Sequence, residues 1–106
     1  VRLFRNRDRW TGFTCEGHAG YAERGSDIIC AAVSALTINA VNSIESIAGD
    51  KVTCEEKDGF LSCTFPEGIS REGEVLMESM ILGLRMTAET TDLDGTPYLE
   101  IIIEED

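Results

Sequence analysis

The chain has 106 residues, of which 42% are hydrophobic, and its nine basic and twenty acidic residues give a formal net charge of −11. This length allows one domain with a single core, and the apolar content excludes a disordered chain. Such an acidic surface repels nucleic-acid phosphates, so we expect no direct nucleic-acid binding and instead an attraction for a basic peptide or protein. A surface that is acidic only for solubility would have the same composition.

Two strands are predicted at the start of the chain. Residues 1–5 and 11–17 show the apolar alternation of strands, and the polar residues between them indicate a turn. Four of the nine basic residues lie here, and such charges are typical of a strand that is exposed at the edge of a sheet. We therefore expect an exposed edge hairpin that carries Arg2, Arg5, Arg7 and Arg9.

A long apolar helix is predicted from Ser26 or Asp27, either of which can cap it, to about Ala48, with Gly49 as its end. Its apolar stretch is long enough to cross a membrane, but serine, threonine, asparagine and glutamate residues interrupt it. Because it is apolar almost all round, we expect a buried helix of a soluble domain, covered on more than one side. The opening residues VRLFRNRDR lack the apolar stretch of a signal peptide, so we expect no secretory signal before this helix.

The stretch KVTCEEKDGFLSCTF predicts a hairpin with Asp58 and Gly59 as a two-residue turn. In that register Cys54 lies opposite Cys63, at a spacing that permits a disulfide. Four cysteines in a chain of a reducing compartment favour reduced thiols, so we expect this pair to be reduced. A slip of the turn by one residue would remove the pairing altogether.

A second helix is predicted from a cap at Ser70 to about Thr91, and a last strand over residues 98–103. The order of elements is therefore ββαββαβ. It predicts a single α+β domain over residues 1–106, with two helices packed on a mostly antiparallel mixed sheet. The buried stripe of the second helix consists of Leu76, Met77, Met80, Ile81, Leu84, Thr87 and Ala88.

The stretch GHAGYAERGSDIICAAVS contains the single histidine of the chain, His18, and places Cys30 at the predicted start of the long helix. With Asp27 as the cap, Cys30 is the third helical residue, where the helix dipole favours a thiolate. A neutral His18 nearby could accept the thiol proton and later return it to a leaving amine. Unpaired N–H groups at the helix start could stabilise an oxyanion. These are the components of a cysteine hydrolase.

Other residues of the stretch are candidates for supporting this chemistry. Asp27 and Ser34 share a helix face with Cys30, although Ser34 could instead bond back to a helix carbonyl. The loop over residues 19–26 fits a lid with hinges at Gly20 and Gly25 and a substrate contact at Tyr21. A plain surface connection would look the same in the sequence.

Two other interpretations of the stretch remain open. One is an inert buried thiol and an unrelated surface histidine. The other is a metal site formed by Cys15, His18 and Cys30. In a regular strand, however, residues three apart point to opposite faces, and no fourth ligand is evident. We therefore expect neither a metal nor another cofactor.

The motif G-H-A-x5-G-x-D-I-x-C-A-x-x-S, here Gly17 to Ser34, resembles the signature of the ribosomal-processing cysteine protease family, Prp. This resemblance implies a cytoplasmic bacterial endopeptidase that acts as a homodimer. It places the nucleophile at Cys30 and the general base at His18. The aspartate and serine of the motif fall on Asp27 and Ser34 as supporting groups.

The resemblance also implies a substrate. Members of the family remove a short N-terminal extension from large-subunit ribosomal protein twenty-seven, and cleavage after an aromatic residue implies an apolar pocket beside Cys30. A basic ribosomal protein suits the acidic charge of the chain. The competing hypothesis is a non-catalytic acidic module that binds a basic ribosomal protein during ribosome assembly. Neither hypothesis involves a membrane.

Overall fold

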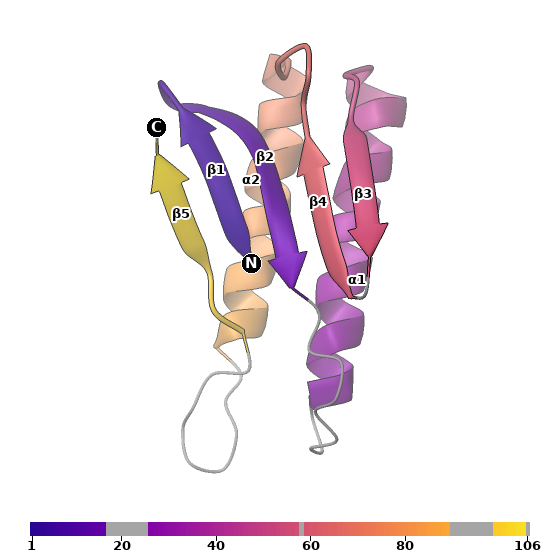
Figure 1. Cartoon of the computed structure of the whole chain (residues 1–106), viewed down its shortest axis with the longest axis vertical. Helices are drawn as coiled ribbons and strands as arrows, with labels where there is room; N and C mark the ends of the chain where they lie inside the picture. Colours follow the sequence, from indigo (N-terminus) through magenta and orange to yellow (C-terminus); the bar gives the residue numbers. More distant parts are fainter. Residues whose placement is uncertain (17–25, 58, 90–98, 106) are drawn as a thin grey trace.

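The computed structural model of the chain describes residues 1–16, 26–57, 59–89 and 99–105 (Figure 1). The side chains of Ser26 and Asp27 are outside this description. The order of elements in the described residues confirms the predicted ββαββαβ. The elements are β1 (Arg2–Asn6), β2 (Arg9–Glu16), α1 (Ser26–Ser43), the π-helical turn η1 (Ile44–Ala48), β3 (Thr53–Lys57), β4 (Phe60–Thr64), α2 (Arg71–Ala88) and β5 (Ile102–Glu105).

The five strands form one sheet in the order β3-β4-β2-β1-β5. All neighbouring pairs are antiparallel except β1 and β5, which run parallel. Both helices lie side by side on the same face of this sheet (Figure 1). The predicted α+β fold, with two helices packed on a mostly antiparallel mixed sheet, is confirmed.

The prediction of an edge hairpin at the start of the chain is wrong. β1 and β2 are inner strands, because β5 pairs with the outer side of β1 and β4 pairs with β2. The arginines of β1 meet the carboxylates of β5 in the ion pairs Arg2–Glu104 and Arg5–Glu105. The basic strand β1 therefore pairs with an acidic strand from the other end of the chain.

The core lies between the sheet and the two helices. Three side chains that are aligned across β1, β2 and β4 have no exposed surface, namely Leu3, Phe13 and Cys63. From the helix layer, Met77 and Leu84 of α2 are also fully buried against them. Because successive residues of a strand face opposite sides of the sheet, Phe13 points into the core and the residues next to it in β2 face the other side.

Only part of the apolar α1 surface is covered. Val33 and Ala40 pack into the core, and Leu36 packs against α2. Ile28 and Ile38, on the side away from the sheet, remain 73% and 54% exposed. The stretch Ile28–Ala48 has a mean hydropathy of 1.5, enough for a membrane span by length and composition, and 28% of it is buried. As expected, α1 is covered on more than one side, by the sheet and by α2, and its outer side is uncovered.

Two predicted helix boundaries are confirmed, at Gly49 and Ser70, whereas α2 ends at Ala88, earlier than the predicted end at about Thr91. Gly49 adopts a left-handed φ of 75° after η1, and its N–H donates to the carbonyl of Ile44. Ser70 caps α2, with its Oγ accepting from the N–H of Gly73 at 3.1 Å. Asp50, next to Gly49, accepts hydrogen bonds from the N–H and the hydroxyl of Ser70. One carboxylate thus fixes the end of the first helical segment to the start of the second.

The predicted register of the second hairpin is confirmed, with Lys57 opposite Phe60 and Cys54 opposite Cys63. The expectation of reduced thiols is wrong, because the structure joins Cys54 and Cys63 in a disulfide. The pairing brings their α-carbons to 4.2 Å, so the sulfur atoms of this cross-strand pair meet. The disulfide fastens the edge strand β3 to β4.

Replacing Cys54, the exposed partner of this disulfide, leaves the packing of buried Cys63 intact. We expect Cys54→Ser to lower the free energy of unfolding by about 2–3 kcal/mol, because the unfolded chain loses a short covalent loop. Urea unfolding under non-oxidising and non-reducing conditions measures this loss. A reducing agent should bring the wild type to the level of the variant, and no response of the wild type would contradict the disulfide.

Gly12 in β2 lies against the neighbouring backbone, because a Cβ built there would be 2.4 Å from the carbonyl oxygen of Cys63. We expect Gly12→Ala to destabilise the fold by about 1–3 kcal/mol, since two paired strands must separate to admit the methyl group. The control is Gly83→Ala, whose Cβ would meet the rotatable end of Leu36. Equal losses in thermal unfolding for both variants would refute this explanation.

Candidate active site

The helix that carries Cys30 begins one residue earlier than the favoured cap. α1 starts at Ser26, so Asp27 is its second residue rather than its cap, and Cys30 is its fifth residue rather than its third. Ser26 already has helical backbone, which moves the start of the hydrogen-bonded turn toward the N-terminus. The Cys30 side chain is half-buried just beyond the first turn, and the effect of the helix dipole falls off within that turn.

The end of β2 lies beside the start of α1. Cys15, the next-to-last residue of β2, is half-buried on the helix side of the sheet, in line with Phe13. Burial raises the pKa of the Cys15 thiol, the positive charge of the chain's N-terminus lowers it by less, and the negative charge of Cys30 adds a smaller increase. The two thiols are therefore close enough to interact electrostatically. Cys15 accordingly stays protonated at a pH at which an ordinary thiol begins to ionise.

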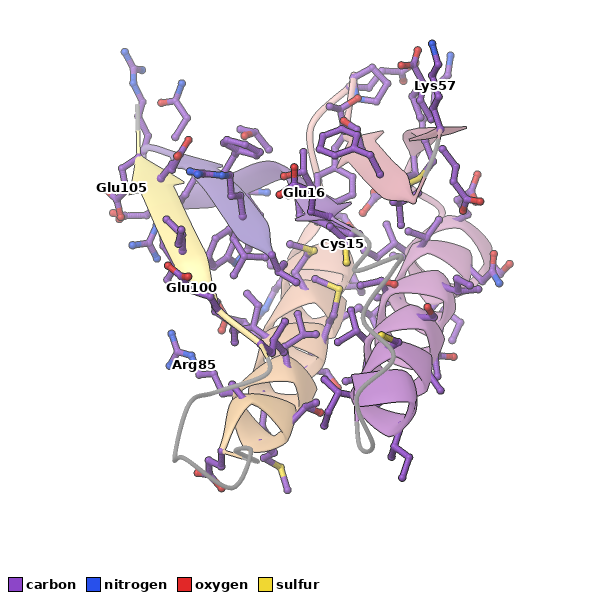
Figure 2. All side chains as sticks on the ribbon, turned by 60° about the horizontal axis from the view of Figure 1, so that its bottom comes forward. Cys15, Glu16, Lys57, Arg85, Glu100 and Glu105 are labelled. Carbon is purple, nitrogen blue, oxygen red and sulfur yellow. A yellow bond between two sulfur atoms is a disulfide. The ribbon has the colours of Figure 1, made fainter. Side chains whose placement is uncertain are left out.

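Cys15 is a site residue that the sequence interpretation included only in the metal alternative. Its position follows from strand alternation, because Phe13 and Cys15 are two residues apart and share one face of β2. Glu16 lies on the opposite face, opposite Phe60 of β4 (Figure 2). The alternation of side chains along this strand could be predicted from the sequence. What the sequence did not show is that β2 is an inner strand, with β4 on one side and β1 on the other.

The predicted residues between β2 and α1 lie outside the described residues. They are the general base His18 and the loop residues Gly20, Tyr21 and Gly25. In the sequence, only Gly17 separates His18 from Glu16, the last residue of β2. The structure thus brings Cys15 and Cys30 together, and it tests neither the histidine nor the predicted lid.

Of the two predicted supporting residues, only Ser34 has a described side chain. It is exposed one turn after Cys30, and its carbonyl oxygen accepts from the hydroxyl of Thr37 at 3.2 Å. Thr37 is 1% exposed and also donates to Val33, so its hydroxyl is satisfied within the helix. Asp27 belongs to the helical backbone of the first turn.

This arrangement allows thiol chemistry at one end of the helix layer. The first N–H groups of a helix have no partner four residues back, and they point toward the end from which Cys30 projects. Within the described residues no group of three histidine, cysteine or acidic side chains could hold a metal ion. A cavity of about 510 Å³ opens on the uncovered face of the sheet, lined by Phe4, Phe60 and Glu16 among others, but Cys30 does not line it.

The sequence pattern of the family described as cysteine protease Prp matches residues 1–93. The ribosomal processing cysteine protease Prp of Bacillus subtilis (strain 168) is 33% identical over 91 residues, which cover 84% of this chain and 81% of that protein. A protein of the same name from Staphylococcus aureus (strain Mu50 / ATCC 700699) is 25% identical over 81 residues, which cover 74% of this chain and 76% of that protein.

Solved structures show the same fold. SMU.848 from Streptococcus mutans superposes with a TM-score of 0.82 at 26% identity, and the match covers 99% of this chain and 96% of that one. The ribosomal processing protease Prp from S. aureus, in complex with a covalently linked product peptide, gives a TM-score of 0.81 at 21% identity, with coverages of 98% and 97%. The family match and the relatives agree with the resemblance found in the stretch around Cys30: this chain belongs to the cysteine protease Prp family and is a cysteine protease.

Proposed function

We propose that this protein is a cytoplasmic, homodimeric endopeptidase that removes the N-terminal extension of large-subunit ribosomal protein twenty-seven. Its nucleophile is the Cys30 thiolate, and His18 is the general base and acid. The observation that carries the proposal is the position of Cys30 near the start of α1, within electrostatic range of Cys15 at the end of β2. Because only Gly17 lies between Glu16 and His18, the covalent chain keeps the histidine near that strand end.

The proposed reaction is acyl transfer in two steps. His18 accepts the proton of Cys30, and the thiolate attacks the carbonyl carbon of the scissile peptide bond. The C–N bond then breaks as the imidazolium returns the proton to the leaving amine, which leaves a thioester on Cys30. A water molecule, deprotonated by His18, attacks the thioester and releases the carboxylate product and the thiol. Both oxyanions form near the N–H groups at the start of α1.

The remaining predicted residues have supporting roles in this proposal. Asp27 orients His18 or the loop, and Ser34 contacts the substrate backbone near the sulfur. Gly20 and Gly25 act as hinges of a lid, and Tyr21 contacts the substrate. Exposure of Ser34 on the helix surface next to Cys30 supports its assignment.

Charge and the names of relatives support the substrate. The chain has a net charge of −11, which attracts a basic ribosomal protein and increases its rate of encounter. Relatives that are up to 33% identical are named ribosomal processing proteases. A structure of the S. aureus protease contains a substrate peptide, which supports a peptide as the molecule that this fold accommodates.

Incubation with the extended ribosomal protein of the same organism under reducing conditions tests this function. Mass spectrometry should detect two products, namely the short extension and the mature protein. We expect Cys30→Ala and His18→Ala to reduce cleavage by at least about 10³-fold, because each removes a group that the reaction requires. Thermal unfolding of both variants should match that of the wild type.

Cys15→Ala is the matched control, since it removes the neighbouring thiol but not the proposed nucleophile. It should retain cleavage to within about tenfold of the wild type. An unchanged substrate mass with the wild-type protein would argue against the protease assignment. Tight binding of the uncut substrate by all four proteins would instead support the non-catalytic acidic module.

The reactivity of the thiols with iodoacetamide provides a second test. Cys30 should reach its half-maximal labelling rate below pH 8.5, which is about the value of an unperturbed thiol, because a helix start stabilises the thiolate. Burial raises the pKa of Cys15, so Cys15 should label more slowly at neutral pH and only at higher pH reach comparable rates.

Peptide mapping by mass spectrometry separates the labelled cysteines. Cys54 and Cys63 should label only after reduction, because they form a disulfide. A Cys30 that labels no faster than Cys15 across the pH range would contradict an activated nucleophile.

A further inference from the structure

The side of the helix layer that faces away from the sheet carries a continuous row of uncharged side chains on each helix. We call this surface the outer helix face. The spacing of three and four residues places each row on one side of its helix. All of its members are exposed: Ile28, Ala31, Ala35 and Ile38 of α1, and Val75, Ser79, Leu82 and Met86 of α2.

The two rows form a single surface, because α1 and α2 are in close contact. Leu36 of α1 packs so closely on Gly83 that a Cβ there would lie 2.7 Å from its Cδ2 atom. The helices run side by side in opposite directions over most of their length (Figure 1). The start of α1, with Ile28, is therefore at the same end as the last turns of α2, with Met86.

The exposed apolar area is large for a domain of this size. Ile28 is 73% exposed, Ile38 is 54% exposed, and Val75, Leu82 and Met86 are each 62% exposed. Five aliphatic side chains in this state present on the order of 500 Å² of apolar surface, which is the size at which a patch marks an interaction site. A stable protein interface buries about 800 Å² on each partner. The small residues of the two rows and the polar residues beside them can supply the area that the five apolar side chains do not.

Charge identifies the partner that fits this face. None of the eight side chains is charged, although 27% of the residues in the chain are. A basic protein would be recognised by carboxylates, which are absent from these rows. An anionic membrane repels a chain of charge −11. Two acidic copies repel one another least where both surfaces are uncharged, and an identical self-complementary surface on both copies closes a two-fold dimer.

We propose that the outer helix face is the dimer interface of this protein and that its occupant is the outer helix face of a second copy. The inference rests on the proposed function only for the existence of a homodimer. Ile28 is two residues before Cys30 in the same helical turn. Pairing of the two copies therefore buries the first turn of α1 on its outer side and holds each nucleophile at the margin of the interface.

Sedimentation equilibrium at tens of micromolar protein tests the interface. The wild type should have twice the monomer mass of 11.6 kDa. Leu82→Glu on α2 and Ile38→Glu on α1 should each sediment as the monomer, because dimerisation would bury a carboxylate from each copy in an apolar contact. Both positions are exposed, so both variants should show the far-UV circular dichroism of the wild type.

Ile47→Glu is the matched control. Ile47 has the same residue type and the same 73% exposure as Ile28, but it lies in η1, outside the outer helix face. This variant should remain a dimer. A dimeric Leu82→Glu and Ile38→Glu would refute the interface and leave the homodimer and the protease assignment intact. A wild-type monomer, including one that cosediments with phosphatidylcholine vesicles, would overturn both the interface and the homodimer, and the cleavage assay remains independent of either result.

Discussion

The burial of Phe13 in the central strand β2 is the constraint on which the rest of the structure depends. Its side chain is fully buried, and across the sheet it is aligned with Leu3 of β1 and Cys63 of β4. A shift of β2 by one residue would turn Phe13 to the uncovered face and Cys15 with it. The same register that closes the core therefore keeps Cys15 on the helix side of the sheet.

The position of Cys30 is determined by the packing of the helical segment that carries it. Val33, Ala40 and Ile44 anchor the helical segment to the sheet, and Leu36 fits against Gly83 of α2. At the far end, Asp50 connects the segment to the cap of α2 through its bonds to Ser70. The start of α1 is also held in the core, because Ile29, directly before Cys30, is buried. A helix start held in this way can expose its thiol to substrate without losing its direction.

Features set by neighbouring residues were predictable from the sequence. The turn at Asp58-Gly59 defined the register of the second hairpin, and Ser70 and Gly49 marked helix ends by their own hydrogen-bonding and backbone preferences. The place of β5 was not predictable, because its parallel partner β1 lies about a hundred residues away in the chain. The false edge hairpin followed from that omission. Cys15 was missed for the same reason, since its proximity to Cys30 depends on strand order.

The placement of β5 also affects how the charges of the chain are distributed over its surface. The ion pairs Arg2–Glu104 and Arg5–Glu105 hold two of the nine basic residues of the chain at one edge of the sheet. At the opposite edge, β3 is exposed along its whole length and carries Glu55 and Glu56. The outer helix face carries no charge in its eight positions. These three surfaces differ in the partners that they attract. The proposed basic substrate would be drawn to the acidic side, and contact between copies would cost least on the neutral helices, so the proposed substrate and second copy need not compete for the same surface.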